Sequence, residues 1–232
     1  AMSMRYSGYE TIVIKGASRY PVYVAIHNDK VTFRDASSIW HLSSAIDVGK
    51  ILREIEPGAG RRSIIRIGPA GERGITYADV NVDTYRHFGR LGLGTVFGAK
   101  KLKAMLISGN RELKSPEHNA YRKTVSMLYD TIVKTGLTEK YHNLGTSENI
   151  LVLNELKGLP TRNLQAASFE GAETISGEFF AEKYLLRRVS CAGCPIGCIH
   201  VAMLKRAFSK AHEYEALNIS YDFELISALG SN

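Results

Sequence analysis

All three cysteines of this 232-residue chain lie within eight positions, at Cys191, Cys194 and Cys198. Thiols so close together are a poor basis for a disulfide framework and a good one for a metal site. The chain must therefore fold around a hydrophobic core. With 44% hydrophobic and 23% charged residues it can bury one, and reducing surroundings fit the cysteines best.

The Cys-x2-Cys-x3-Cys group contains two glycines, Gly193 and Gly197, which permit the positive φ angles of a metal-binding loop. Soft thiolates at these spacings let one turn of backbone aim three sulfurs at a common centre. The fourth ligand is open. Either His200 completes a Cys3His zinc site, or a cysteine outside this chain completes a [4Fe–4S] cluster. Because His200 follows Cys198 by only two positions, the spacing favours the cluster.

The first half of the chain predicts mixed α and β structure. Its apolar residues come in short β-branched runs, which are typical of strands. Between them, apolar residues from Leu42 to Ile55 recur at helical intervals and predict one helix packed on the sheet. The expected strands cover residues 10–14, 22–26, 63–67 and 102–107.

After Ser115 and Pro116, a helix-start signal, the apolar spacing becomes helical. The expected helices cover about 116–136, 139–157, 176–187 and 222–232. The fold class is therefore α+β, with a β-rich first domain over 1–110 and a mainly helical second domain over 111–232. The sequence begins at Ala1 rather than at a methionine, and its last residues predict an apolar helix with no capping signal or tail composition, so we expect both domains to be incomplete.

The net charge of +7 is spread along the sequence, because Lys and Arg are scattered rather than clustered. This pattern predicts a solvated surface rather than a nucleic-acid interface. No apolar run approaches the roughly 20 residues that span a bilayer, and no signal-peptide pattern occurs. We expect a cytoplasmic protein with no nucleic-acid partner and no membrane.

A glycine-rich segment from Tyr85 to Lys101 resembles an anion cradle. Glycines let backbone N–H groups approach phosphate oxygens, and Arg86 and Arg90 can grip them bidentately. A helix starting near Gly94 would add its positive end. The segment lacks the spacing of a dinucleotide site or a P-loop. On these residues alone, a tight turn at a domain junction explains it better.

Several motifs follow one another along nearly the whole chain. They are Ser7-Gly-Tyr-Glu-Thr-Ile-Val-Ile-Lys-Gly16, Pro21-Val-Tyr-Val24, Arg34-Asp-Ala-Ser-x-Ile-Trp40, Ile67-Gly-Pro-Ala-Gly-Glu72, the Arg86–Ala104 segment, Gly158-Leu-Pro-Thr-Arg-Asn163 and Cys191-x2-Cys-Pro-Ile-Gly-Cys198. Read together, they resemble the aldehyde ferredoxin oxidoreductase family of tungsten enzymes, whose members are considerably longer.

The resemblance implies a tungsten, sometimes molybdenum, held by the dithiolenes of two pyranopterins, with magnesium bridging the pterin phosphates and a [4Fe–4S] cluster nearby. The implied reaction is the two-electron oxidation of an aldehyde to its carboxylic acid. The implied partners are a small aldehyde, ferredoxin or a similar electron acceptor, and the remaining segments of the enzyme. A homo-oligomer is compatible with this reading. By itself the chain is expected to be inactive.

The resemblance also assigns roles to residues. Cys191, Cys194 and Cys198 match three cluster ligands, with the fourth beyond Asn232. The segment that meets the pterin phosphates and magnesium corresponds to Arg86, His87, Gly89, Arg90, Gly92 and Gly94. His87 and Phe88 stand where small residues are expected, and the family's two Asp-x-x-Gly-Leu motifs are missing from this sequence.

A glutamate near the metal is the implied catalytic residue. Glu224 precedes an Ala-Leu-Gly-x-Asn run at the spacing of the family, whereas Glu215 copies the local residues better but lies nine positions earlier. A dry pocket could raise the pKa of such a carboxyl enough for proton transfer. Glu224 is the candidate and Glu215 the alternative.

Two other functions stay open. The chain could be a non-catalytic cluster- or zinc-binding module of a larger assembly, or a zinc-stapled nucleic-acid binder, which the scattered charge disfavours. The sequence does not distinguish tungsten from molybdenum, and it does not identify the aldehyde.

Overall fold

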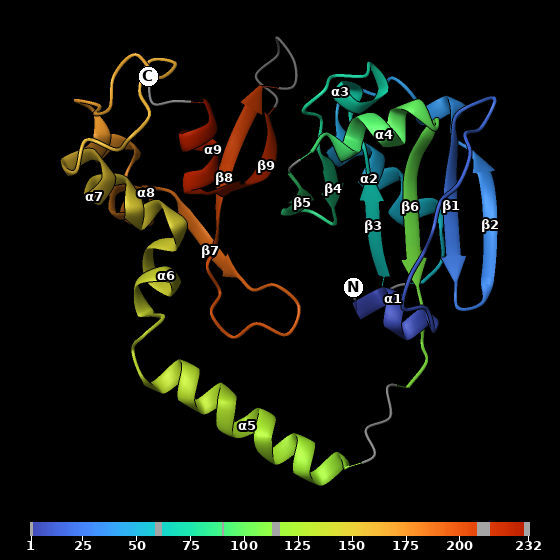
Figure 1. Cartoon of the computed structure of the whole chain (residues 1–232), viewed down its shortest axis with the longest axis horizontal. Coiled ribbons are helices and arrows are strands. Elements are labelled where there is room, and N and C mark those ends of the chain that lie inside the picture. Colours follow the sequence, from blue (N-terminus) through green and yellow to red (C-terminus); the bar gives the residue numbers. More distant parts are fainter. Residues whose placement is uncertain (1, 59–61, 90, 113–116, 208–213, 230–232) are drawn as a thin grey trace. The chain divides into compact units, whose positions relative to one another are not determined.

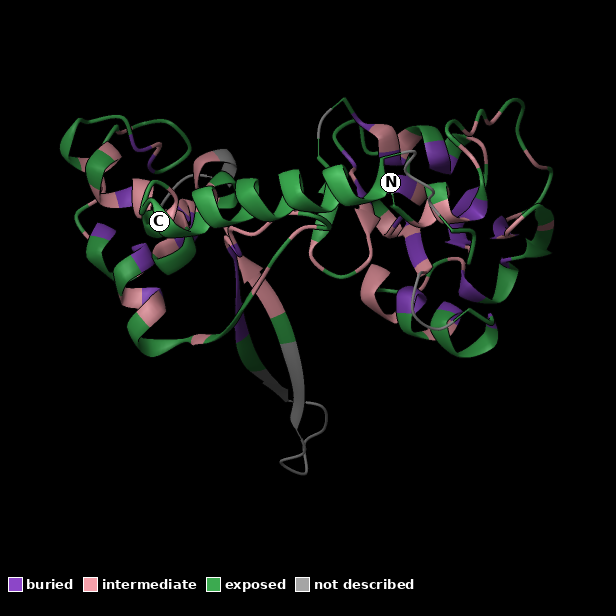
Figure 2. Ribbon diagram, turned by 90° about the horizontal axis from the view of Figure 1, so that it is seen from below, coloured by how far each residue is buried: buried purple, intermediate pink, exposed green. Residues whose placement is uncertain are grey.

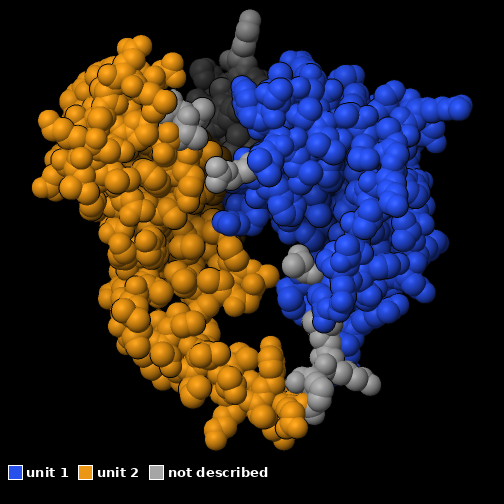
Figure 3. Space-filling view, in the orientation of Figure 1, with its two compact units in different colours: residues 1–115 blue, residues 116–232 orange. Residues whose placement is uncertain are grey.

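The computed structural model describes residues 2–58, 62–89, 91–112, 117–207 and 214–229, except for the side chains of 205–217 and 228–229. The chain divides into two compact units, residues 1–115 and 116–232 (Figure 3). The sequence placed the division after residue 110. No helix among the described residues is long and apolar enough to cross a membrane.

Unit 1 is built on a six-stranded sheet with the order β2-β1-β6-β3-β4-β5 (Figure 1). Strands β1 and β6 are parallel, and the other neighbours are antiparallel. The strands are β1 (Val22–His27), β2 (Lys30–Asp35), β3 (Arg62–Arg66), β4 (Val80–Val82), β5 (Arg86–Phe88) and β6 (Leu102–Ser108). The expected strands at 22–26, 63–67 and 102–107 are confirmed.

The strand expected at residues 10–14 is wrong, since this segment joins no sheet. Its apolar side chains have another explanation. Ile12 and Ile14 pack against the core beside β1 and β6, while Val13 is 70% exposed. Burial of Ile12 and Ile14 against the core therefore accounts for this β-branched run, without a hydrogen-bonded ladder.

Side chains of the sheet alternate between two apolar cores. Val22 and Val24 face one core with Phe97 of α4 (Leu93–Ala99). Tyr23 and Ala25 face the other, which α2 (Ala45–Ile55) covers. Successive side chains of a strand point to opposite faces of the sheet. A strand can therefore be apolar throughout only when both faces of the sheet are buried. The helix expected between residues 42 and 55 is thus confirmed, beginning at its cap Ser44. The other helical segments of unit 1 are α1 (Met2–Ser7), η1 (Ser37–Ile39) and α3 (Pro69–Glu72).

Unit 2 combines helices with a three-stranded antiparallel sheet, β7-β8-β9. Its elements are α5 (His118–Lys134), α6 (Glu139–Leu144), η2 (Gly145–Glu148), α7 (Asn149–Glu155), η3 (Ala172–Ile175), α8 (Gly177–Lys183), β7 (Leu185–Val189), β8 (Ile199–Ala207), β9 (Tyr214–Tyr221) and α9 (Phe223–Leu229). The α+β class is confirmed, but the sequence did not predict this sheet. Every residue of α5 except Ile132 is exposed, and Figure 2 shows the helix as an exposed element.

Two expected helices of unit 2 differ from the structure. The helix expected over 139–157 is interrupted at Gly145, whose φ of +67° cannot continue an α-helix. The helix expected over 176–187 ends at Lys183, because residues 185–189 pair with β8 instead. In both places tertiary pairing and one glycine override the helical spacing of apolar residues.

Candidate functional site

The cysteine loop, residues 190–198, connects β7 to β8. Its first part is a tight turn in which the Cys194 N–H donates to the Cys191 carbonyl at 3.0 Å. Gly193 has φ +77° and Gly197 has φ +69°. Both glycines thus adopt the left-handed conformation that the sequence led us to expect, and which other residues enter only with strain.

The three cysteines are half-buried, and none forms a disulfide. Three thiols on one short loop are a donor set suited to a soft metal or an iron–sulfur cluster. Their sulfurs do not converge, however. In the described part of the chain, no three His, Cys, Asp or Glu side chains are arranged to hold a metal ion. The structure therefore shows a loop with suitable chemistry rather than a closed coordination sphere.

His200, the alternative zinc ligand, is only 1% exposed. Its Nε2–H donates to the His142 carbonyl at 2.9 Å, so the proton lies on Nε2 and the lone pair on Nδ1. Burial lowers the pKa of His200, which keeps the ring neutral. Nδ1 has no hydrogen-bond partner among the described residues. A zinc site that used His200 would have only this nitrogen available.

The glycine-rich segment begins at β5, an exposed strand at the end of the sheet order. Arg86 and His87 are both exposed there, so an anion can reach them. A Cβ on Gly89 would lie 3.0 Å from the His87 ring. Arg90, also predicted to bind the cofactor, lies outside the described residues.

Gly92 and Gly94 have a packing role that the sequence did not indicate. A Cβ on Gly92 would overlap the Thr76 carbonyl oxygen, and one on Gly94 would overlap that of Asp79. The Gly94 N–H already donates to the Ala78 carbonyl at 2.9 Å. These glycines therefore let α4 pack closely on the segment before it, and the N–H of Gly94 is not available to a phosphate.

Glu224 lies in the first turn of α9 and is exposed. Its Oε2 accepts a hydrogen bond from Thr146 Oγ1 at 2.9 Å, and the same hydroxyl accepts from the Phe223 N–H at 3.0 Å. Thr146 follows Gly145, where a Cβ would lie 3.2 Å from the Cys198 carbonyl oxygen. The η2 turn thus connects Glu224 with the cysteine loop. For the alternative, Glu215, the structure places only the backbone, in β9.

Thr146 was not predicted, although the run Gly145-Thr-Ser147 within an expected helix was a signal of a turn. Another unpredicted feature is a buried ion pair between Lys103 and Glu72, both almost fully buried. Glu72 and Lys103 both lie within motifs that carry the family resemblance. An internal ion pair therefore explains two of these residues without any role in catalysis.

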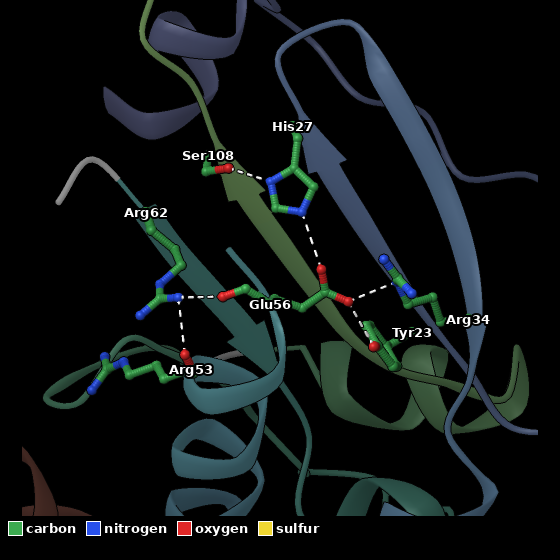
Figure 4. A network of polar contacts seen from close by, with 7 residues as sticks. All are labelled: Tyr23, His27, Arg34, Arg53, Glu56, Arg62 and Ser108. Carbon is green, nitrogen blue, oxygen red and sulfur yellow. Dashed lines mark hydrogen bonds and ion pairs between the residues drawn. The ribbon is translucent and has the colours of Figure 1, made fainter. Parts of the chain in front are cut away.

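A second buried carboxylate, Glu56, has several partners that Figure 4 displays. Its side chain is 1% exposed and bonds to Tyr23 Oη at 2.7 Å, to Arg34 Nε at 2.7 Å and to His27 Nε2 at 3.1 Å. His27 Nδ1 lies 2.5 Å from Ser108 Oγ. We call these five residues the Glu56 cluster. Burial, followed by the hydrogen bond to Glu56, raises the pKa of Tyr23 to about 12.

Ser108, His27 and Glu56 are bonded to one another in the order of a nucleophilic triad, but their surroundings differ from those of an active site. Ser108 is 7% exposed, and a Cβ on Gly58 would lie 2.8 Å from its hydroxyl. A substrate has no room at this oxygen. The cluster instead joins the end of α2 to β1, β2 and β6, and Arg62 adds a bond to the Glu56 carbonyl at 2.8 Å. Its role is structural.

Comparison with known proteins identifies the class to which this fold and cysteine loop belong. Residues 1–109 match the model of the aldehyde ferredoxin oxidoreductase N-terminal domain, and residues 123–232 match that of domains 2 and 3 of the same enzymes. The two matches cover nearly the whole sequence. The chain belongs to the aldehyde ferredoxin oxidoreductase family.

Particular relatives refine this result. Tungsten-containing aldehyde ferredoxin oxidoreductases of Thermococcus kodakarensis and Pyrococcus abyssi are each 36% identical, over 219 and 218 residues, and each match covers 92% of this chain. The chain spans only 35% of the length of these relatives. An aliphatic sulfonate oxidoreductase, WOR-like subunit, of Pyrococcus furiosus is 25% identical over 242 residues, covering 100% of this chain and 38% of that protein.

Among solved structures, the active site complex BamBC of benzoyl coenzyme A reductase with 1,5-dienoyl-CoA has a TM-score of 0.63 and 25% identity. The match covers 93% of this chain and 34% of that one. Relatives of this chain thus include proteins named for different substrates, so the family alone does not define the substrate.

Proposed function

We propose that this chain contributes to an oxidoreductase that converts an aldehyde to its carboxylic acid at a tungsten or molybdenum pterin and passes electrons through a [4Fe–4S] cluster to ferredoxin. The observation that supports it most is the cysteine loop, with its two left-handed glycines, in a chain 36% identical to tungsten-containing aldehyde ferredoxin oxidoreductases. We expect activity only with the remaining segments of the enzyme.

In this proposal the thiolates of Cys191, Cys194 and Cys198 hold three irons of the cluster. A cysteine outside the chain supplies the fourth ligand. When bound, such a cluster carries single electrons away from the site of substrate oxidation. The role of this chain is to hold three thiolate donors on one loop. The tight turn at Gly193 brings the backbone of Cys191 and Cys194 close together.

The pterin phosphates and their magnesium would meet the segment from β5 to α4. Arg86 is exposed, and its guanidinium can form paired hydrogen bonds with a phosphate. The proposed residues are Arg86, the backbone of His87, Gly89, Arg90, Gly92 and Gly94. For Gly92 and Gly94 we propose an indirect contribution, since the close packing they permit fixes the segment that follows Arg86.

Glu224 is the proposed group for proton transfer to or from the substrate. Thr146 donates to Oε2 and so orients the carboxylate. Oε1 is then the oxygen that takes or gives the proton. A general acid or base must be held within reach of the proton that it transfers. The hydrogen bond from Thr146 restrains the Glu224 side chain in this way.

A second candidate function is a zinc-binding module without catalysis. The buried Nδ1 of His200, which lacks a partner among the described residues, favours it. Three thiolates and this nitrogen would form a Cys3His set. In that case the cysteine loop would stabilise the fold of unit 2 rather than conduct electrons.

Metal and acid-labile sulfide analysis of the chain, purified or reconstituted without oxygen, tests the two candidates. Iron with sulfide, and the broad visible absorption of an iron–sulfur cluster, is the expected result. One zinc per chain without sulfide would overturn the cluster and make His200 a ligand. Tungsten or molybdenum in the full-length enzyme, with aldehyde-dependent reduction of ferredoxin, tests the activity.

A further inference from the structure

His142, in α6, holds the cysteine loop through two different groups. Its ring Nδ1–H donates to the Ile196 carbonyl at 2.7 Å, at a point between Cys194 and Cys198. Its own backbone carbonyl accepts the Nε2–H of His200 at 2.9 Å, two residues after Cys198. One residue of a helix thus fixes the chain on both sides of Cys198.

The His142 ring also fits against the backbone of Gly197. A Cβ at that position would lie 3.3 Å from His142 Nδ1 and 3.6 Å from Cε1. The distance to Nδ1 is shorter than an ordinary van der Waals contact, so a side chain at residue 197 would displace the ring by a few tenths of an ångström. Gly197 is therefore needed for two reasons: it adopts the left-handed conformation with φ +69°, and its lack of a side chain leaves room for the His142 ring.

The helix behind His142 is itself anchored. The His142 N–H donates to the Thr138 carbonyl at 3.0 Å, and the Gly145 N–H that closes α6 donates to the Tyr141 carbonyl. Gly145 then passes so close to the loop that a Cβ on it would lie 3.2 Å from both the Cys198 carbonyl and His200 Nδ1. The loop is thus attached to a regular element, which positions ligands better than a loop alone.

We propose that His142 is a positioning residue that sets the separation of Cys194 and Cys198 for the metal group. This inference rests on the proposed cluster site. The hydrogen bond to Ile196 uses the Nδ1 proton, so the ring acts on the loop backbone rather than on the metal. The hydrogen bond to the Ile196 carbonyl joins the loop to α6 through residues of this chain alone, so it restrains the loop and reduces the cost of ordering it when a metal group binds.

Two substitutions separate the hydrogen bond from the bulk of the ring. In His142→Asn, the side-chain amide can place an N–H close to the position of Nδ1, whereas His142→Ala has no donor. Asn143→Ala changes the exposed neighbour and is the matched control. His142 is exposed and its backbone contacts persist in every variant, so we expect all three to fold, as far-UV circular dichroism and thermal unfolding will show.

Hydrogen–deuterium exchange of the metal-free chain is the first measurement. In His142→Ala the amide of Cys194, which donates to the Cys191 carbonyl, should exchange about tenfold faster, because the loop loses one hydrogen bond that restrains it. His142→Asn and Asn143→Ala should stay within about twofold of the wild type. Wild-type exchange in His142→Ala would overturn the proposal.

Reconstitution with iron and sulfide is the second measurement. We expect the His142→Ala cluster to pass its iron to a chelator about tenfold faster and to give an altered paramagnetic resonance spectrum when reduced, and His142→Asn to restore both. An unaltered spectrum and release rate in His142→Ala would contradict positioning. If the wild type takes up no cluster even in the full-length enzyme, where the fourth ligand is present, the proposed function fails, while the exchange measurement still decides whether His142 holds the loop.

Discussion

The Glu56 cluster of unit 1 and the cysteine loop of unit 2 both gather polar groups beside a strand, but their groups are bonded to very different extents. The Glu56 carboxylate has three donors, Tyr23, His27 and Arg34, and His27 in turn contacts Ser108. In the cysteine loop the thiols do not converge, and His200 Nδ1 lacks a partner among the described residues.

This difference distinguishes a structural cluster from a loop that we propose as a binding site. A buried polar group costs free energy unless it is bonded, so a cluster whose groups are all bonded is complete without a ligand. The cysteine loop instead gathers three thiols, a donor set that suits a soft metal or an iron–sulfur cluster. The buried carboxylate of unit 1 thus stabilises the fold, whereas we propose that the thiols of unit 2 bind a metal group.

The largest expected effect is in the cysteine loop. Cys194→Ser should reduce bound iron and sulfide to background, because serine replaces a soft thiolate with a hard hydroxyl. The free energy of unfolding of the metal-free chain should change by less than about 1 kcal/mol, since the side chain is only half-buried. Metal analysis and urea unfolding give the two quantities. Ser190→Ala in the same loop should keep the wild-type metal content, and full metal content in Cys194→Ser would remove this cysteine from the site.

Glu56→Ala should produce the opposite pattern, with no loss of bound metal and a large loss of stability. Removing the carboxylate leaves Tyr23 and His27 without their partner in a buried position. We expect the free energy of unfolding to fall by about 3 kcal/mol. Urea unfolding followed by circular dichroism measures it, with the exposed Glu54→Ala as the control. Equal stability of the two variants would show that the cluster contributes little to the fold.

The pH dependence of stability should depend on Tyr23. Its pKa is raised to about 12 in the folded chain, against about 10 for an exposed tyrosine. The folded state therefore holds this proton more tightly, so the contribution to stability is present below pH 10 and is lost as pH rises toward 12. Between pH 9 and 11 the wild type should lose about 1.4 kcal/mol more than Tyr23→Phe. Tyr77→Phe, at an 82% exposed residue, should behave as the wild type, and identical pH profiles for all three chains would contradict the assignment.

Local patterns predicted those parts of the fold that are buried on both sides. Strands β1 and β6 were predicted because almost every side chain in them is buried. Strands β2 and β5 are largely exposed, and neither contains a continuous run of buried apolar residues that would mark it as a strand. Their existence follows from tertiary contacts that a local reading does not contain.

The candidate site divides in the same way. The left-handed glycines of the cysteine loop could be predicted, because the turn is formed by adjacent residues. The contacts from His142 to Ile196 and from Thr146 to Glu224 join residues 54 and 78 positions apart. The same is true of Lys103 and Glu72, 31 positions apart, whose motif residues gave no sign that they form an ion pair. Sequence spacing predicts candidate ligands, but the residues that hold the loop in place are found only in the fold.

The smallest expected effect concerns Thr146, which shares a property with each of the two groups. Its hydroxyl both donates and accepts a hydrogen bond, as in the Glu56 cluster, and it also orients a proposed catalytic residue. Thr146→Val removes the donor to Glu224 and the acceptor for the Phe223 N–H while keeping the shape of the side chain. We expect a loss of about 0.5–1 kcal/mol in the free energy of unfolding. Thr146→Ser retains the hydroxyl and should retain most of this stability.

If Glu224 transfers the proton, the full-length enzyme with Thr146→Val should also show a lower kcat and a shifted pH profile, which Thr146→Ser restores. A lower stability with an unchanged pH profile would assign Thr146 to the fold alone and place it with the Glu56 cluster.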